Sequence, residues 1–399
     1  MSDEKPAALG GLRLLEITQG MSGSICGRLL SELGAEVIKI ESPVGDSIRN
    51  LPPFKLDKIS YAFESVSVNK KSVVLDLRKS EGKLILKRLI KGADIFIEDY
   101  PVGSMDNLEI GYGVLKKVNL KLIYCSITPF GQNSPLRNKE SSDIIVQAMS
   151  GVMATTGFLQ DPPTKAGFPI SEFISSIYAV IGILTALHYR EESGKGQAID
   201  ISMVDCLLSY FTTYLPTLFM TGKVPPKRGN RHTTISPWNS YEAKDGWVFI
   251  CTGNNDEWNR ILEVMEYDYL IHDQRFDTNE KRVKIEEEVD AMLNKWTKKH
   301  TVEDIIKILE GAKISVGPIF AIDQLLTDPH FLYRRMVTEV DHPSAGKIPV
   351  VGSMFKMSET PGVIKTAAPL LGQHTEEVLI DLLGYTRKDI QDLRTKEVI

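Results

Sequence analysis

Short apolar segments alternate with helical segments through the first 130 residues, and this alternation constrains the fold more than any other feature of the chain. Strands are predicted at 12–18, 36–41, 72–77, 94–98 and 122–128, with helices between them at 24–33, 81–90 and 112–117. Regular alternation of this kind indicates an α/β fold with a parallel, doubly wound sheet and helices on both of its faces. Ligands of such sheets bind beyond the carboxyl ends of the strands, so we expect the functional site at that edge.

The rest of the chain predicts a helical region followed by a second unit. Helices are predicted at 143–155, at 172–190 and from 202 onward, and the polar stretch 223–232 is typical of a linker. Beyond it the pattern predicts a strand at 247–251 and helices at 257–265, 281–298 and 302–309. The tail from 328 ends in a helix at 376–383 and a shorter one after 386. A length of 399 residues fits about two domains.

Charge and residue spacing exclude several classes of function. With 47 Lys and Arg against 52 Asp and Glu the net charge is −5, which does not favour a nucleic-acid partner. The polar N-terminus and the lack of a run of about 18 apolar residues predict neither a signal peptide nor a membrane span. Four widely spaced cysteines suit reduced thiols, so we expect a cytoplasmic protein. The seven histidines lack metal-ligand spacing, so no metal site is expected.

The turn between the first predicted strand and helix carries Gly20 and Gly23. Exposed N–H groups at the start of a helix can hold a phosphate, and Glu41 ends the next strand where a ribose-binding acid would lie. The third glycine of a dinucleotide fingerprint is missing, however. The residues alone therefore favour a plain structural turn over a phosphate site, and they make a nicotinamide-dependent dehydrogenase remote.

Glu172 lies directly before a helix whose apolar residues recur at helical spacing. Ser171 could cap that helix, and an acid in the first turn is stabilised by the helix dipole by roughly 0.3–1 kcal/mol. The same field would keep the Glu172 carboxylate ionised and therefore nucleophilic. Sequence alone favours the structural interpretation and leaves the nucleophile open. The stretch 193–197 (SGKGQ) is interpreted as a turn that ends this helix rather than as a phosphate loop.

Several motifs follow one another along almost the whole chain: GLRLLEIT at 11–18, LGAEVIKIE at 33–41, NKKS at 69–72, IEDY at 97–100, IYCSITPFG at 123–131, QAMSG at 147–151, SGKGQ at 193–197 and LGQH at 371–374. Their order and spacing resemble the family III CoA-transferases nearly from end to end. This family includes formyl-CoA and carnitine CoA-transferases and α-methylacyl-CoA racemase.

The resemblance implies a particular architecture. A large Rossmann-like domain would be built from residues 1–205 and from the C-terminal return 328–399. Residues 206–227 would form a linker, and residues 228–327 a smaller inserted α+β domain. Two chains would interlock, either as a homodimer or as a heterodimer with a related chain.

The resemblance also implies the chemistry, which is transfer of CoA from an acyl-CoA donor to a free carboxylic acid through a covalent anhydride and thioester on an enzyme carboxylate. Glu172 matches the position of the family's usual aspartate nucleophile. Coenzyme A takes part as a portion of the substrates, and no tightly bound cofactor is expected. The matching CoA-binding positions are Met21, Ser22, Leu75, Arg78, Asp99, Tyr100, Asn107 and Lys139. Asn107 stands where the family has an arginine.

Three further expectations follow from this comparison. Met21 and Leu51 would give the acyl pocket an apolar lining, which favours a medium-chain, branched or aromatic acceptor acid. A racemase needs two proton shuttles, and Ser142 stands where the family's racemases have a histidine, so racemisation is the weaker alternative. Because Glu172 replaces the usual aspartate, a non-catalytic partner subunit is a third interpretation.

Overall fold

The computed structural model describes residues 6–55 and 59–399. The chain divides into two compact units. Residues up to Val152, together with Lys165–Thr213 and His330–Ile399, form the first unit. The second unit combines Met153–Thr164 with Tyr214–Pro329. The expected linker 206–227 contains the end of helix α9 (Met203–Leu208) and all of α10 (Tyr214–Thr221).

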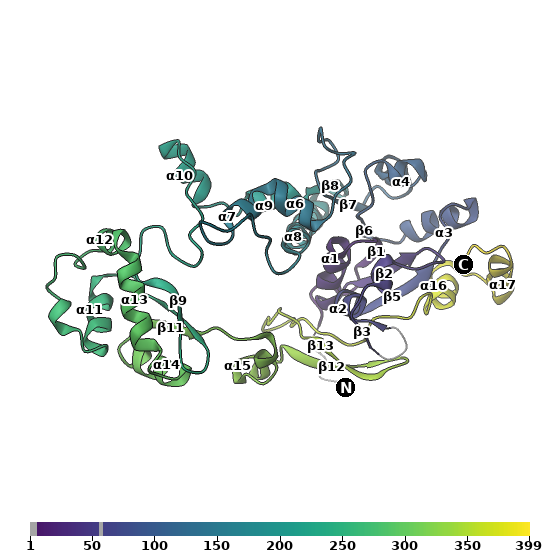
Figure 1. Cartoon of the computed structure of the whole chain (residues 1–399). Coiled ribbons are helices and arrows are strands. Elements are labelled where there is room, and N and C mark those ends of the chain that lie inside the picture. The colour runs from purple at the N-terminus through teal and green to yellow at the C-terminus, as the bar shows by residue number, and fades with distance from the viewer. Residues whose placement is uncertain (1–5, 56–58) are drawn as a thin grey trace. The chain divides into compact units, whose positions relative to one another are not determined.

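A six-stranded parallel sheet forms the centre of the first unit (Figure 1). The spatial order is β5-β2-β1-β6-β7-β8, with bounds β1 Arg13–Ile17, β2 Glu36–Glu41, β5 Lys70–Val74, β6 Ile95–Glu98, β7 Ile123–Thr128 and β8 Ala198–Ser202. Counted along the chain, these strands take the order 3-2-1-4-5-6 of doubly wound Rossmann sheets. The prediction of a parallel α/β sheet is confirmed, and the switch point of the topology lies between β1 and β6.

The edge strand β8 is the one strand of this sheet that the sequence pattern missed. It pairs with β7, with Asp200 opposite Ser126. Its five residues, AIDIS, include a charged residue and are only partly buried, so no continuous apolar run marks it. The helix α8 (Ile170–Ser193) precedes it and ends at Gly194, whose φ is 68°. The stretch 193–197 is therefore a helix-ending turn, as predicted.

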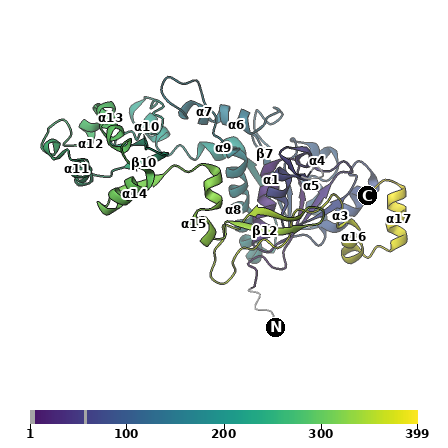
Figure 2. The ribbon, with the colours of Figure 1, turned by 60° about the horizontal axis from the view of Figure 1, so that its bottom comes forward.

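Helices pack on both faces of the sheet because successive strand residues point to opposite sides. Leu14 faces one core and Leu15 the other. The helices on the first face are α1 (Met21–Glu32), α2 (Tyr61–Ser67), α6 (Asp143–Ser150), α8 and α9. Those on the second are α3 (Ser80–Ile90), α4 (Ser104–Asn107), α5 (Tyr112–Val118), α16 (Thr375–Leu383) and α17 (Arg387–Thr395). Figure 1 shows α16 beside the outer strand β5, and α17 lies next to α16 in both views (Figures 1 and 2).

A hairpin in the C-terminal tail was not predicted from the sequence. It consists of β12 (Val337–His342) and β13 (Gly346–Val351), and it buries Val340, Ile348 and Val350. Its alternating pattern is interrupted by Pro349, which hides the strand signal. The remaining short elements are η1 (Ser47–Asn50), β3 (Phe54–Lys55), β4 (Ile59–Ser60), α7 (Val152–Thr155) and α15 (Pro329–Tyr333).

The second unit is an α+β body with its own core. Its antiparallel sheet has the order β11-β10-β9, and α13 packs on β9. Its elements are β9 (Trp238–Glu242), β10 (Trp247–Cys251), α11 (Asn255–Val264), η2 (Asp268–Leu270), α12 (Asn279–Lys284), α13 (Glu286–Thr297), α14 (Val302–Gly311), β11 (Ser315–Pro318) and η3 (Ile322–Leu326). The helix predicted at 281–298 is two helices, because the backbone leaves the helical region at Ile285, where φ is −123° and ψ is 31°.

A neutral cluster of four charged side chains is fully buried beneath α1. The Lys39 ammonium lies 2.9 Å from Glu16 Oε1 and 2.7 Å from Asp46 Oδ2, and Lys70 Nζ lies 2.7 Å from Glu16 Oε2. A Cβ atom at Gly27 would come within 2.0 Å of Glu16 Oε2, so glycine lets α1 pass directly over the cluster. Burial raises the pKa of Glu16, but the two ammonium groups outweigh burial and hold that pKa below its ordinary value.

Helix α8 presents a second apolar surface in addition to its packed side. Ile174, Ile183 and Leu187 are buried against the sheet, whereas Phe173, Ile177, Ile181 and Leu184 are exposed. We call these four side chains the α8 stripe. Within the described residues, α8 alone has the length and composition to cross a membrane, but half of its apolar stretch is buried in the unit. That burial is typical of a helix belonging to a protein core.

Candidate functional site

The first turn of α1 and the loop after β6 meet at the switch point of the sheet. Asp99 Oδ1 accepts a hydrogen bond from Gln19 N at 2.8 Å, and Oδ2 accepts from Gly20 N at 3.1 Å and Gly23 N at 3.4 Å. A Cβ at Gly23 would lie 2.3 Å from Thr18 Cγ2, so the glycine is needed for this close approach. These N–H groups therefore donate hydrogen bonds to a carboxylate of the protein itself. This agrees with the interpretation of the segment as a structural turn. Burial raises the pKa of Asp99 to about 6.

Helix α8 brings Glu172 to the same region. The Ser176 hydroxyl lies 2.6 Å from the Ser22 carbonyl oxygen and 2.6 Å from the Glu172 carbonyl oxygen, and it donates its single proton to one of them. The contact holds the beginning of α8 against the first turn of α1. Both Glu172 and Ser22 thus lie beside the carboxyl ends of β1 and β6, where the topology places ligands.

The environment of the Glu172 carboxyl group opposes ionisation. Its Oε2 atom is buried, and within residues 6–55 and 59–399 it has no hydrogen-bond partner. Burial, then the charge of Asp143, then that of Asp99 raise the pKa of Glu172 to about 7. The helix N-terminus therefore does not hold the pKa of Glu172 at or below its ordinary value, as the sequence-based interpretation expected. Burial and two neighbouring carboxylates outweigh the field of the helix dipole.

The same geometry corrects the predicted role of Ser171. Helix α8 starts at Ile170 after Pro169, so Ser171 lies inside the first turn and is not the cap. Its backbone N–H and its hydroxyl both donate to Asp143 Oδ1, at 2.9 Å and 2.6 Å. The donors at the start of α8 thus bind the Asp143 carboxylate rather than Glu172.

Three of the predicted CoA-binding residues line one cavity of about 290 Å³ at the carboxyl ends of β1, β2 and β5. Leu75, Arg78 and Tyr100 contribute to its wall, and we call it the β5-side cavity. The Arg78 guanidinium is held by Asp76, with Nε 2.9 Å from Oδ1 and Nη2 2.8 Å from Oδ2. A phosphate bound by Arg78 would therefore share this side chain with Asp76.

A second cavity of about 590 Å³ lies on the other side of Tyr100, at the ends of β6 and β7. Asp99, Tyr100, Arg137 and Lys139 line this β7-side cavity. Neither Arg137 nor Lys139 forms an ion pair in the part of the chain that the structure describes. Lys139 Nζ only approaches Met149 Sδ, at 3.4 Å. The sequence comparison identified Lys139 but missed Arg137, two residues earlier in the same loop.

The remaining predicted positions do not line these cavities. Met21 is the first residue of α1, and Ser22 is buried with its carbonyl against Ser176. Asn107 ends α4, between Leu108, which lines the β5-side cavity, and Asp106. The structure thus groups five of the predicted binding residues, Leu75, Arg78, Asp99, Tyr100 and Lys139, around Tyr100.

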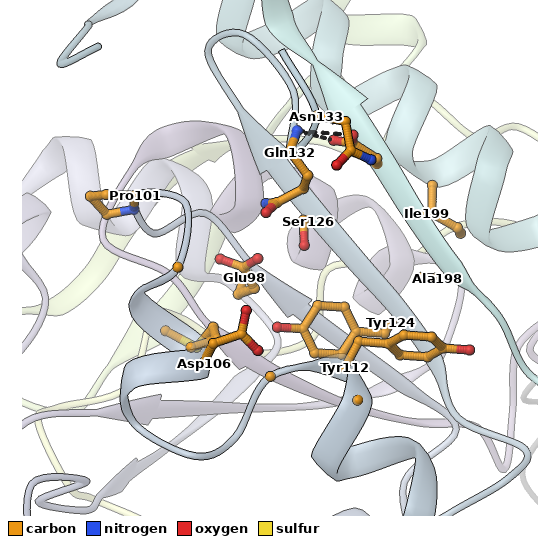
Figure 3. Close-up of a pocket in the computed structure, with 15 residues that line it drawn as sticks. Glu98, Pro101, Asp106, Tyr112, Tyr124, Ser126, Gln132, Asn133, Ala198 and Ile199 are labelled. Atoms are coloured by element: carbon orange, nitrogen blue, oxygen red, sulfur yellow. Dashed lines mark hydrogen bonds between the residues drawn. The ribbon is translucent and has the colours of Figure 1, made fainter. Parts of the chain in front are cut away.

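A third cavity of about 290 Å³ contains polar residues that sequence reasoning missed (Figure 3). Glu98, Ser126 and Asp200 lie in register on β6, β7 and β8 and share one face. The Glu98 and Asp106 carboxyl groups and the Tyr124 ring surround a common space (Figure 3). Burial is the main cause that raises the pKa of Glu98 to about 7. A polar residue near the end of each of the two apolar strands β6 and β7 was the available sequence signal.

A doubly wound sheet with cavities at its carboxyl edge and a buried carboxyl group beside its switch point is the arrangement of an α/β enzyme for a nucleotide-bearing substrate. The model of CoA-transferase family III matches residues 9–375. The chain belongs to this family and is a CoA-transferase.

Relatives and a solved structure agree with this assignment over the full length. The succinyl-CoA–D-citramalate CoA-transferase of Chloroflexus aurantiacus is 33% identical over 400 residues, which cover 100% of both chains. The succinyl-CoA:mesaconate CoA-transferase of Haloarcula hispanica is 35% identical over 93% of this chain and 96% of that protein. The crystal structure of a CaiB/BaiF family protein from Brucella suis matches with a TM-score of 0.87 at 30% identity, covering 95% of this chain and 100% of the other.

Proposed function

We propose that this enzyme transfers CoA from succinyl-CoA to a short dicarboxylic acid, with Glu172 as the nucleophile. The buried Glu172 oxygen without a hydrogen-bond partner carries this proposal, because a free carboxylate oxygen is the group that must attack the thioester. The names of both relatives contain succinyl-CoA and the anion of a dicarboxylic acid. They therefore support a dicarboxylate acceptor in place of the medium-chain, branched or aromatic acid expected from Met21 and Leu51.

The reaction proceeds by successive acyl substitutions, in which a carboxylate or thiolate anion attacks an acyl carbon and displaces another anion. The Glu172 carboxylate attacks the thioester carbonyl carbon, a C–O bond forms, and the C–S bond breaks to release the CoA thiolate. The thiolate then attacks the Glu172 carbonyl of the mixed anhydride, which releases succinate and leaves a CoA thioester on the enzyme. The acceptor carboxylate repeats these steps in reverse. Each step exchanges one anion for another, so no net proton is consumed.

The two cavities that meet at Tyr100 are suited to the CoA portion of the substrate. The apolar wall at Leu75 fits a base ring, and Arg137 and Lys139 supply positive charge for phosphates. Binding of CoA across both cavities would place the nucleotide at the carboxyl edge of the sheet.

Lys139→Ala should raise the KM for succinyl-CoA by about tenfold with little change in kcat. Loss of one charge-assisted hydrogen bond to a phosphate weakens binding of ground state and transition state alike. Initial-rate kinetics measure the effect, and Lys195→Ala, at an exposed lysine in the turn after α8, is the matched control. An unchanged KM would remove Lys139 from the binding site.

Intact-mass measurement after incubation with succinyl-CoA tests the proposed function. Wild-type protein should gain a covalent adduct, and Glu172→Gln should not. A panel of acceptors should then show faster transfer to short dicarboxylates than to medium-chain or aromatic acids. The opposite ranking would restore the apolar-acceptor hypothesis, and a wild-type chain that never forms an adduct would favour the non-catalytic subunit.

We also propose that the α8 stripe is covered by a second chain, either a copy or a related subunit. Four exposed apolar side chains on one helix form a patch of the kind that association buries. Ile181→Glu should therefore convert a dimer to monomers in light scattering coupled to size exclusion. Leu84→Glu, at an exposed leucine of α3, controls for the added charge. Wild-type protein that is already monomeric on its own would rule out a copy of this chain as the partner and leave only a related subunit.

A further inference from the structure

We propose that Asp143 is a positioning residue that holds Glu172 and drives its acylation by electrostatic repulsion. This inference rests on the proposed function, in which Glu172 is the nucleophile. Asp143 is the first residue of α6, and its carboxylate is nearly buried. No feature of the sequence singled it out.

The carboxylate of Asp143 connects α6 to the first turn of α8 directly and to Ala166 through Gln147. Oδ1 accepts the N–H and the hydroxyl of Ser171, and Oδ2 accepts from Gln147 Nε2 at 2.6 Å. Gln147 Oε1 in turn accepts from Ala166 N at 2.9 Å. Because both oxygens accept hydrogen bonds, the carboxylate is fixed in position, and it fixes the first turn of α8 that carries Glu172.

The charge of Asp143 acts on Glu172 in a direction that favours the reaction. Acylation turns the Glu172 carboxylate into a neutral anhydride and moves its negative charge to the CoA thiolate. A neighbouring fixed carboxylate destabilises the charged reactant, and it leaves the neutral adduct unaffected once the thiolate, which carries the displaced charge, has moved away. The repulsion that raises the pKa of Glu172 therefore also favours the covalent intermediate.

The charged groups around Glu172 come from two elements. Asp143 lies on α6, and Asp99 lies in the loop after β6. The first turn of α1, which contacts α8 through Ser22, contains no acidic residue. Asp99 is bonded to three N–H groups of the α1 turn, so it is part of the sheet edge and a poor site for a selective change. Asp143 also accepts three hydrogen bonds, but an asparagine there keeps the oxygen that accepts from Ser171 and alters only the contact with Gln147.

Asp143→Asn is the variant that tests the inference. Its amide oxygen can still accept from Ser171, but its amide nitrogen would face Gln147 Nε2. The double variant Asp143→Asn with Gln147→Glu restores a donor–acceptor pair at that contact and returns a carboxylate to the cluster one side chain away, so it should recover the structure and move the midpoint back toward the wild-type value. Asp205→Asn, in the first turn of α9 and exposed, is the matched control.

The pH dependence of single-turnover adduct formation is the decisive measurement. With a pKa near 7, wild-type Glu172 is about one-tenth ionised at pH 6 and nine-tenths ionised at pH 8. Asp143→Asn should move the midpoint down by about one unit, which raises the pH 6 to pH 8 rate ratio about fivefold. The same lost repulsion should lower the equilibrium amount of adduct by up to about tenfold. Asp205→Asn should change neither quantity.

The outcomes separate this inference from the proposed function. If Glu172→Gln forms no adduct while Asp143→Asn keeps the wild-type midpoint and adduct level, the role of Asp143 is wrong and the nucleophile stands. If Glu172→Gln still forms the adduct, the proposed function itself fails. A merely structural role for Asp143 would lower activity equally at both pH values, and the double variant would restore it without any shift of the midpoint.

Discussion

Glu172→Gln should lower the rate of CoA transfer by about 10⁴-fold or more, the scale on which removal of a catalytic nucleophile acts. Glutamine fills the same volume but has no anionic oxygen to attack a thioester. The variant should still fold, since Glu172 Oε2 has no hydrogen-bond partner among the described residues and its loss leaves none unpaired. Steady-state kinetics with succinyl-CoA measure the effect, and circular dichroism verifies folding.

Two companion variants make that result specific. Glu191→Gln changes an exposed glutamate near the end of the same helix and should leave the rate unchanged. Glu172→Asp keeps the functional group on a shorter arm, and a displacement of about 1 Å should cost about 100-fold. A rate increase in Glu172→Asp would mean that the pocket suits the family's usual aspartate better than the glutamate present here.

Glu16→Gln should destabilise the first unit by about 3–5 kcal/mol, the cost of breaking a buried ion pair by removing one partner. Glu16 contacts both Lys39 and Lys70, and all three side chains have no solvent exposure. Among the residues that the structure describes, glutamine would leave Asp46 as the one anionic partner within ion-pair distance of the two buried ammonium groups. Urea unfolding monitored by circular dichroism measures the loss.

Glu36→Gln is the control for this stability effect. Glu36 pairs with Arg13 and Lys71, but its side chain is 32% exposed, so its loss should cost no more than about 1 kcal/mol. If both substitutions lowered the free energy of unfolding equally, burial would not be the reason that the Glu16 ion pairs stabilise the protein.

Part of the candidate site was identified through the family resemblance, which implied Leu75, Asp99 and Tyr100 as CoA-binding positions. All three line cavities at the carboxyl edge of the sheet, where the pattern of strands and helices predicted the site. Arg137 could not be found in this way, since its loop has no regular pattern and its importance depends on the cavity that it lines. The pairing of Arg78 with Asp76 also required coordinates.

The sequence by itself determined the parallel sheet, the order of its first five strands along the chain and the end of α8 at Gly194. Apolar periodicity and glycine conformation are local properties, so a short window of residues contains them. Tertiary structure decided three other features. It raises the pKa of Glu172, it lets Asp143 accept the hydrogen bonds of Ser171, and it brings Asp99 to the N–H groups of the turn before α1. Each of these depends on burial and on charges that are distant in sequence, which only folding brings within a few ångströms.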